Sequence, residues 1–600
     1  MVCRAVRYER TSQWGSRSCS ARATVAAAAA VVAGACGGGA REPRAPAAGP
    51  CAAAADVALI GGDVWTMDDA APHAEAIAWR DGRIVAVGTV AEVRRHVGPG
   101  TRVIDLDGRT VTPGLIDAHA HLYGLGGALA TVALKGAASE VEAAERIAAA
   151  AAGRAAGEWI TGRGWDQTRW QPARFPTRAT LDAAVPDHPV AVRRVDGHAL
   201  WANSRALALA GVTRATADPP GGKIVRDAAG EPTGVLVDAA MDLIEAKIPE
   251  PSAAERRRRI AAAARVAVAA GLTGVHEMGL TDDTIAVYRE MAADGELPLR
   301  VYALLAYRAG IAGELATRKR YLDDGDGRFS LRGVKAFADG ALGSRGAALL
   351  APYADDPGNT GLEITGRDEL AALAMAAADA GWQVAVHAIG DRGNRNALDA
   401  FERAIAAHPG ADLRFRVEHA QVLAPEDIPR FGALGVIASM QPTHATSDMR
   451  WAEQRLGPER VRGAYAWRSV LASGGRIAAG SDFPVEEVSP LLGVYAAVTR
   501  QDAQGQPPGG WYPDQRLTLA EALHAFTADA AYAGFAEDRV GRLRAGMLAD
   551  VTVFDRPLAA DRSLLATKVE LTVVGGRAVH ASEWARAELA EPPAADLLCR

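Results

Sequence analysis

The chain has 600 residues, enough for about four domains of roughly 150 residues or for one barrel enzyme with added segments. Its 49% hydrophobic residues can bury a large aliphatic core, and 72 acidic against 66 basic side chains give a formal net charge of -6. These values exclude a small disulfide module and a fibrous chain, and they disfavour nucleic acid as a partner.

All cysteines lie near the two ends of the chain, at Cys3, Cys19, Cys36, Cys51 and Cys599. The body between Cys51 and Cys599 therefore has no thiol for a metal site, a nucleophile or an interior disulfide framework.

Residues 1–35 have the pattern of an export signal. An Arg-rich start runs into the apolar stretch from Thr24 to Ala35, which is too short to span a bilayer. Small residues directly precede Cys36, so the segment resembles a bacterial lipoprotein leader. We expect an exported protein, either attached to the membrane of the cell envelope through a lipidated Cys36 or secreted. A misassigned start on a cytoplasmic protein is the alternative.

Gly, Pro and Ala dominate residues 36–55, and such a composition predicts a disordered tether. Short alternating apolar runs with Asp-Gly turns follow in residues 56–111, and a matching set occupies residues 536–590. These runs indicate β-hairpins, and we expect strands from both chain ends to pair into one small β-sandwich. Residues 501–535 are predicted to form C-terminal helices, and residues 591–600 a tail.

Between these ends, residues 112–500 alternate apolar strand patterns with Ala-rich helix patterns, which predicts parallel strands with crossover helices. Eight strand candidates occupy residues 112–121, 272–279, 299–307, 331–340, 382–391, 414–421, 435–444 and 475–484. Eight such units close a (β/α)8 TIM-like barrel, whose reactive side chains lie at the carboxyl ends of the strands. The fold class is thus α/β, with an inserted subdomain at about residues 124–270, after the first barrel strand.

Five of the predicted strands end in side chains that suit a metal. His119 and His121 alternate along the first strand, so both point to the same face, here the barrel lumen. The fourth, fifth, sixth and eighth strands end in Lys335, His387, His419 and Asp482. Burying these groups without a ligand costs about 1–3 kcal/mol per unsatisfied neutral group. Imidazole with carboxylate suits zinc or another first-row divalent ion.

This combination of barrel, sandwich and strand-end residues resembles the amidohydrolase superfamily of metal-dependent hydrolases, from Asp56 to about His580. The joint presence of GRGWDQ, DGHALWANSRAL, VKAFADGALGSRGAALL, VHAIGDRG, RFRVEHAQ, SMQPTHATSD and GSDFPVE is similar to the branch that contains N-substituted formamide deformylase.

The resemblance implies a divalent metal, zinc by its ligands, at one or two ions per chain. It implies that His119, His121 and Asp482 hold the more buried ion, and that His387 and His419 hold the second. Lys335 occupies the position of a bridging lysine that carbon dioxide converts to a carbamate. With a single ion, His419 would instead be an orienting or acid/base group, as in deaminase relatives.

The resemblance also implies a reaction. A metal-bound hydroxide attacks the carbonyl of a small-molecule amide or N-substituted formamide, and Asp482 carries the proton to the leaving nitrogen. Two alternatives stay open: a cyclic amidase or deaminase on the same barrel, and a non-catalytic envelope protein that binds a solute. The sequence has no nucleophile elbow, phosphate-binding loop or H-E-x-x-H motif. A homo-oligomer is neither predicted nor excluded.

Four further residues are candidates for substrate binding. His198, in the inserted segment, is expected to approach the pocket or to satisfy its own loop. His444 follows the seventh strand and is expected to contact substrate or to support a metal ligand. Arg345 could bind a substrate carboxylate. Trp165 is expected to wall an apolar pocket or to pack the inserted subdomain.

Overall fold

The structure is a computed structural model that describes residues 54–194, 199–220, 222–343 and 345–590. The predicted export signal, Cys36, almost all of the tether, His198 and the tail lie outside the described residues. The expectations for these segments therefore stay predictions.

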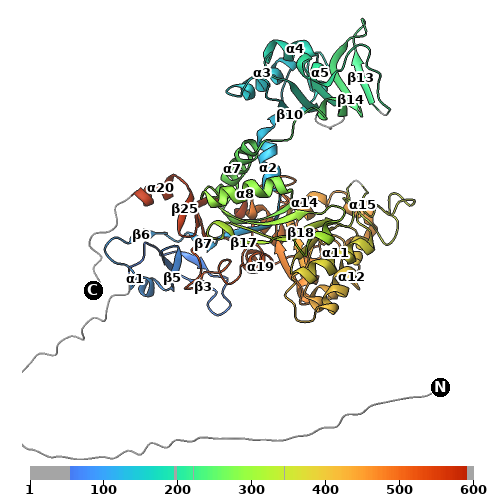
Figure 1. Cartoon of the computed structure of the whole chain (residues 1–600). Coiled ribbons are helices and arrows are strands. Elements are labelled where there is room, and N and C mark those ends of the chain that lie inside the picture. Colours follow the sequence, from blue (N-terminus) through green and yellow to red (C-terminus); the bar gives the residue numbers. More distant parts are fainter. Residues whose placement is uncertain (1–53, 195–198, 221, 344, 591–600) are drawn as a thin grey trace, which may run out of the picture. The chain divides into compact units, whose positions relative to one another are not determined.

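Eight parallel strands form the central sheet, and they are the eight that the sequence predicts (Figure 1). In sheet order they are β8 (Leu115–Ala120), β15 (Leu272–Leu280), β16 (Arg300–Ala306), β18 (Phe329–Phe337), β19 (Gln383–Ala388), β20 (Arg416–His419), β21 (Ile437–Met440) and β22 (Arg476–Ala479). The short strand β17 (Tyr321–Asp323) pairs with β18 outside this order.

Backbone hydrogen bonds join the two ends of this sheet at the carboxyl side. The Asp482 N–H donates to the His119 carbonyl at 2.8 Å, and the His121 N–H donates to the Phe483 carbonyl at 2.9 Å. Gly480 permits this approach, because a Cβ there would lie 2.5 Å from the His119 nitrogen. The (β/α)8 barrel of the predicted fold class is confirmed.

Apolar runs produce these strands because both of their faces are covered. Every residue of β8, β20 and β21 is buried. The covering helices show ordinary signals; α11 (Arg367–Ala380) buries Leu370 and Leu373 and ends at Gly381, whose φ of 68° suits glycine. Other helices along the barrel are α2 (Leu122–Ala130), α7 (Ala253–Ala269), α8 (Asp282–Ala293), α9 (Ile311–Glu314), α10 (Asp324–Gly327), α12 (Asp391–Ala407), α13 (Ile428–Leu434), α14 (Pro442–Asp448), α15 (Ala452–Arg460), α16 (Trp467–Ala472), α17 (Pro490–Thr499), α18 (Leu519–Ala525) and α19 (Ala528–Ala533).

Strands from both chain ends share one sheet, as expected. It runs β25 (Arg577–Ala581), β24 (Val569–Val574), β23 (Val551–Phe554), β7 (Thr110–Pro113), β2 (Asp63–Trp65) and β3 (His73–Ala74). The second sheet runs β5 (Arg83–Gly88), β4 (Ala76–Arg80), β1 (Val57–Ile60) and β6 (Arg102–Asp105). Leu59 and Ile104 share one hydrophobic cluster with Val553 and Val573, so the two chain ends form a common β-sandwich core. Helices α1 (Val90–Arg94) and α20 (Glu583–Ala590) accompany it.

A separate sheet lies in the chain between β8 and β15. It runs β13 (Gly222–Arg226), β14 (Pro232–Asp238), β12 (Ala199–Ala202), β11 (Val190–Arg194), β10 (Ile160–Trp165) and β9 (Val132–Ala133). Its helices are α3 (Glu140–Ala151), α4 (Arg178–Ala184), α5 (Ser204–Ala210) and α6 (Asp242–Glu245). Trp165, Trp170 and Trp201 pack in one cluster there, with ring centroids 6.1–6.4 Å apart, so the inserted segment has a hydrophobic core of its own.

Among the described residues, no helix combines the length and the apolar character that crossing a membrane requires.

Candidate metal centre

The carboxyl ends of the barrel strands surround a pocket of about 410 Å3. The structure brings together in it all the residues proposed from the sequence as metal ligands, namely His119, His121, Lys335, His387, His419 and Asp482, and it adds His444. They come from the ends of six barrel strands or the residues just after them, with His119 and His121 both from β8, as barrel geometry requires.

Asp482 lies at the centre of the donor set. One carboxylate oxygen, Oδ1, is 3.2 Å from His121 Nε2 and 3.5 Å from His119 Nε2. The ligand atoms of these three residues all lie within 4.8 Å of one another. Donor atoms about 2.0–2.2 Å from a shared zinc ion would have such a spacing after small adjustments.

Hydrogen bonds fix which ring nitrogen of two histidines is available. The His119 Nδ1–H donates to Glu418 Oε2 at 2.6 Å, because an ionised carboxylate can only accept. The Gln441 amide nitrogen donates to the Ser439 carbonyl, so its oxygen accepts from His419 Nδ1–H at 2.7 Å. In both histidines Nε2 therefore keeps its lone pair for a metal, with the outer nitrogen held as in known metal sites.

Three buried nitrogens in the pocket have no hydrogen-bond partner among the described residues: Lys335 Nζ, His387 Nε2 and His444 Nε2. Each unsatisfied group costs about 1–3 kcal/mol in a folded interior. A bound cation would use the two imidazole lone pairs, and a carbamate on Lys335 would convert its nitrogen into part of an anionic ligand. The residues present thus fit a metal centre.

Two of these ligand candidates also have unusual backbones. His419 has a φ of 71° and Asp482 a φ of 62°, both in the left-handed region that ordinary side chains avoid. Such conformations cost on the order of 1–3 kcal/mol and cluster at functional sites. Both residues are held there by the surrounding strands, which indicates that the direction of their side chains matters.

Burial shifts the protonation of the cluster toward ligand forms. Burial, with the nearby Lys335 charge, lowers the pKa of His119 to about 4 and that of His387 to about 3. Burial also lowers the pKa of Lys335 to about 8. The pKa of Asp482 lies below its usual range because the neighbouring histidines outweigh its burial. The imidazoles of His119 and His387 are therefore neutral at pH 7 and need lose no proton to bind a metal. The pKa of His121 is instead raised, because its contact with Asp482 outweighs its burial.

Sequence reasoning missed the carboxylates that support this cluster. Glu418 accepts from His119 and from the fully buried Arg416, whose Nη1 donates to His276 Nδ1 at 2.7 Å. Asp117 accepts from the backbone of His119 and Ser481, and burial raises its pKa to about 7. The only sequence signal was an acid inside a barrel strand, one or two residues before a histidine.

Glu277, for which no role was drawn from the sequence, accepts the first N–H groups of α2, those of Leu122 and Tyr123. It thereby anchors the helix that follows His121. Asp339 holds the loop after β19 in the same way, by accepting from Ile389 and Gly390 at 2.9 and 2.7 Å.

Of the candidate substrate-binding residues that the structure describes, one lines the pocket and two do not. His444 lines the pocket, 3.7 Å from Asp482 Oδ2. Trp165 is fully buried in the core of the inserted segment and donates to the Val192 carbonyl, so its packing role is the one observed. Arg345 is not free for a substrate carboxylate, because it makes a two-point ion pair with Asp355 at 3.0 and 3.2 Å.

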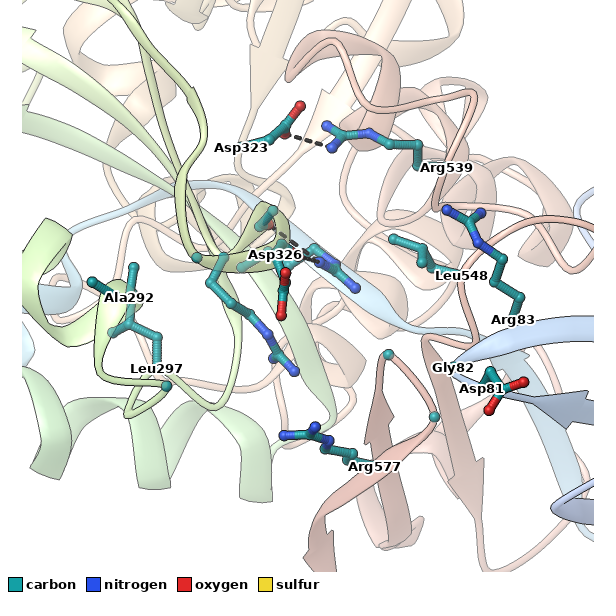
Figure 2. A pocket seen from close by; sticks show the side chains of 18 of the residues that line it. Asp81, Gly82, Arg83, Ala292, Leu297, Asp323, Asp326, Arg539, Leu548 and Arg577 are labelled. Carbon is teal, nitrogen blue, oxygen red and sulfur yellow. Dashed lines mark hydrogen bonds and ion pairs between the residues drawn. The ribbon is translucent and has the colours of Figure 1, made fainter.

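A larger cavity of about 1000 Å3 lies between the β-sandwich and the barrel (Figure 2). None of the described residues that line it is His, Cys or Glu. Two of its arginines are paired with carboxylates: Arg539 contacts Asp323, as Figure 2 shows, and Arg300 makes two bonds of 2.7 and 2.9 Å to Asp550. Among the described residues, the groups of histidines and carboxylates that could hold a metal lie at the barrel mouth, which is therefore the candidate active site.

Comparison with known proteins agrees with this geometry. The sequence pattern of the amidohydrolase family matches residues 102–580. The chain is 37% identical to Protein LONG AFTER FAR-RED 3 of Arabidopsis thaliana over 88% of this chain and 92% of that protein. It is 35% identical to the putative amidohydrolase YtcJ of Bacillus subtilis (87% and 98%) and 30% identical to N-substituted formamide deformylase of Arthrobacter pascens (84% and 93%).

Solved structures of two uncharacterized metal-dependent hydrolases are also similar. The protein from Pyrococcus horikoshii has a TM-score of 0.69 at 29% identity and covers 87% of this chain and 100% of its own. The protein from Pyrococcus furiosus has a TM-score of 0.68 at 29% identity, with coverage of 84% and 99%.

Proposed function

We propose that this chain, which belongs to the amidohydrolase family of metal-dependent hydrolases, cleaves a carbon–nitrogen bond other than a peptide bond, in an amide or an N-substituted formamide. The observation that carries the proposal is the convergence of four histidines, Lys335 and Asp482 at one barrel mouth. The similarity to a deformylase over 84% of this chain supports the substrate class.

The metal that we propose here is zinc, because the donors are imidazole nitrogens and a carboxylate. When bound, it would polarise the substrate carbonyl and lower the pKa of a coordinated water toward about 7. His119, His121 and Asp482 would hold one ion, and His387 and His419 a second. The alternative is one ion per chain, and elemental analysis distinguishes it from two ions per chain.

Lys335 is proposed to bridge the two ions as a carbamate. Carbamate formation requires a neutral amine, and burial favours the neutral form of Lys335 by lowering its pKa to about 8. Within the part of the chain that the structure describes, the nitrogen has no hydrogen-bond partner to compete with this reaction.

Asp482 is proposed to take the proton of the attacking water and to pass it to the leaving nitrogen. Its carboxylate is ionised at neutral pH. It lines the pocket and lies 3.2 Å from His121 Nε2. It is therefore placed between the ligand cluster and the space that a substrate would occupy.

The side chains that line the pocket favour a substrate with an apolar substituent on its nitrogen. Phe337 and Val485 line it and are 40% and 70% exposed to solvent, and Leu342 and Trp451 also line it. A formyl or small acyl group would lie at the ligand cluster, with the substituent of the nitrogen against these side chains.

The test is hydrolysis of N-benzylformamide by the purified, zinc-loaded chain, followed by release of formate and benzylamine. The Asp482→Asn variant is the control for contaminating activity. A hydantoin and an aminopyrimidine, assayed in parallel, represent the cyclic amidase and the deaminase. Cleavage of either of these without cleavage of open-chain amides would contradict the proposal. Absence of stoichiometric metal would instead favour the solute-binding alternative.

A further inference from the structure

His444 has features that neither a packing role nor a surface role explains. It lies in the first turn of α14, directly after β21. Its Nε2 atom is buried and has no hydrogen-bond partner in the residues that the structure describes. This nitrogen points toward Asp482, with 3.7 Å between Nε2 and Oδ2. The His444 ring stacks against that of His419, at 5.7 Å between centroids and an interplanar angle of 19°.

These contacts define a second group of donors. The ligand atoms of His419, His444 and Asp482 all lie within 4.8 Å of one another, as do those of His119, His121 and Asp482. Asp482 faces the two groups with different oxygens: Oδ1 lies near His119 and His121, and Oδ2 lies near His444. A carboxylate with this orientation lies between two adjacent positions for cations and turns one oxygen toward each.

The second group also has its ligand nitrogen assigned. His419 Nδ1 donates to Gln441, so the Nε2 lone pair is left for the pocket. Three neighbouring donors of the imidazole and carboxylate type match the protein ligands of a catalytic zinc site, which keeps a further position open.

We propose that His444, which follows the seventh barrel strand, is a ligand of the second metal ion, together with His419. The set of ligands suggested by the sequence contains no residue from this strand. The inference rests on the metal dependence of the family and not on which carbon–nitrogen bond is cleaved. Its test therefore measures metal binding, and its outcome is independent of any substrate.

The experiment compares His444→Gln with His444→Glu. Both side chains are similar in shape, but only Glu offers an anionic ligand. The zinc content of the dialysed full chain and the Kd of each ion, from competition with a chelator, are measured. We expect two ions in the unchanged protein, a second ion held about 100-fold or more weakly in His444→Gln, and recovery of most of that loss in His444→Glu.

His408→Gln is the matched control, because His408 pairs with Asp379 on the surface, away from the pocket. A second-ion Kd in His444→Gln equal to that of the unchanged protein would overturn the proposal, and so would a single ion in the unchanged protein.

A measurement on the unchanged protein covers the case in which the variants do not fold. X-ray absorption of the zinc-loaded chain counts imidazoles per ion. Five histidines shared by two ions support the proposal, whereas four contradict it.

Discussion

The buried carboxylate of Glu418 should control both the stability of the barrel and its affinity for metal. It accepts from His119 Nδ1 at 2.6 Å and from Arg416 Nε and Nη2 at 2.8 and 3.1 Å. The side chains of Glu418 and Arg416 have no exposed surface. Substitution Glu418→Gln keeps the shape but leaves the Arg416 cation without its carboxylate. Removing one partner of such a pair costs about 3–5 kcal/mol.

The same substitution removes the group that holds His119 in one tautomer. A glutamine amide can turn its NH2 group toward His119 Nδ1, and the imidazole proton would then move to Nε2, where the metal should bind. Loss of such outer partners weakens metal binding by about 10- to 100-fold. Burial and the charge of Arg416 act in opposite directions on the Glu418 pKa, and the low resulting value keeps the carboxylate ionised at all pH values used for assay.

The assay is urea unfolding of the metal-free chain together with zinc affinity from chelator competition. Glu426→Gln is the control, because Glu426 pairs with Arg395 at the surface, and we expect neither quantity to change there. A Glu418→Gln variant that loses stability but binds zinc as the unchanged protein does would refute the tautomer argument. A variant unchanged in both would refute the assignment of the buried pair.

Three further predictions follow from the site. In Asp482→Asn, turnover should fall by about 100-fold or more while at least one metal ion per chain remains by elemental analysis; full activity would contradict the proton transfer. In the metal-free chain, activation by zinc at a fixed concentration of dissolved carbon dioxide should become about tenfold faster from pH 7 to pH 9 and then level off, because the neutral fraction of Lys335 rises through its pKa of about 8. A rise that continues beyond pH 10 would indicate an unshifted lysine. Trp165→Ala should lower the unfolding free energy by about 3–5 kcal/mol without changing KM for a cleaved amide, since Trp165 lies in the core of the inserted segment.

The barrel and the group of strand-end residues could be predicted because they depend on local patterns. Apolar runs with Gly turns fix where each strand ends, and in a parallel barrel all carboxyl ends meet. His119 and His121 needed only the alternation of a strand. His387 and His419 needed only to be the last polar residue of their runs.

Residues whose role depends on a distant partner could not be predicted in this way. Arg345 lies in a Gly-rich loop with a φ of 57°, and only the fold turns it toward Asp355 instead of the pocket. Trp165 shares its sequence features with a pocket wall, and its burial depends on Trp170 and Trp201 from other segments.

Glu418 was missed for a different reason. In a regular strand, neighbours point to opposite faces, so a lumen-facing His419 predicts an outward Glu418. The positive φ of His419 breaks the alternation, and both side chains contact residues of the lumen: Glu418 reaches His119, and His419 packs against His387. A sequence pattern does not reveal this backbone conformation. It allows one strand to supply both a candidate metal ligand, His419, and the carboxylate that supports another ligand, His119.

The barrel lumen below the candidate ligands contains polar side chains, which we call the floor of the site: Arg416, Glu418 and His276. Barrel lumens are usually filled by branched apolar side chains instead. Arg416 donates to Glu418, to His276 and to the Ala118 carbonyl, one residue before His119. One buried guanidinium thus restrains both the backbone of the ligand strand and, through Glu418, the ring of its histidine. Because Arg416 cannot lose its proton, His276 must accept with Nδ1 and stay neutral. The negative charge of Glu418 is then available to balance the guanidinium of Arg416. A substitution of Arg416 or Glu418 should therefore alter metal binding by the histidines above them.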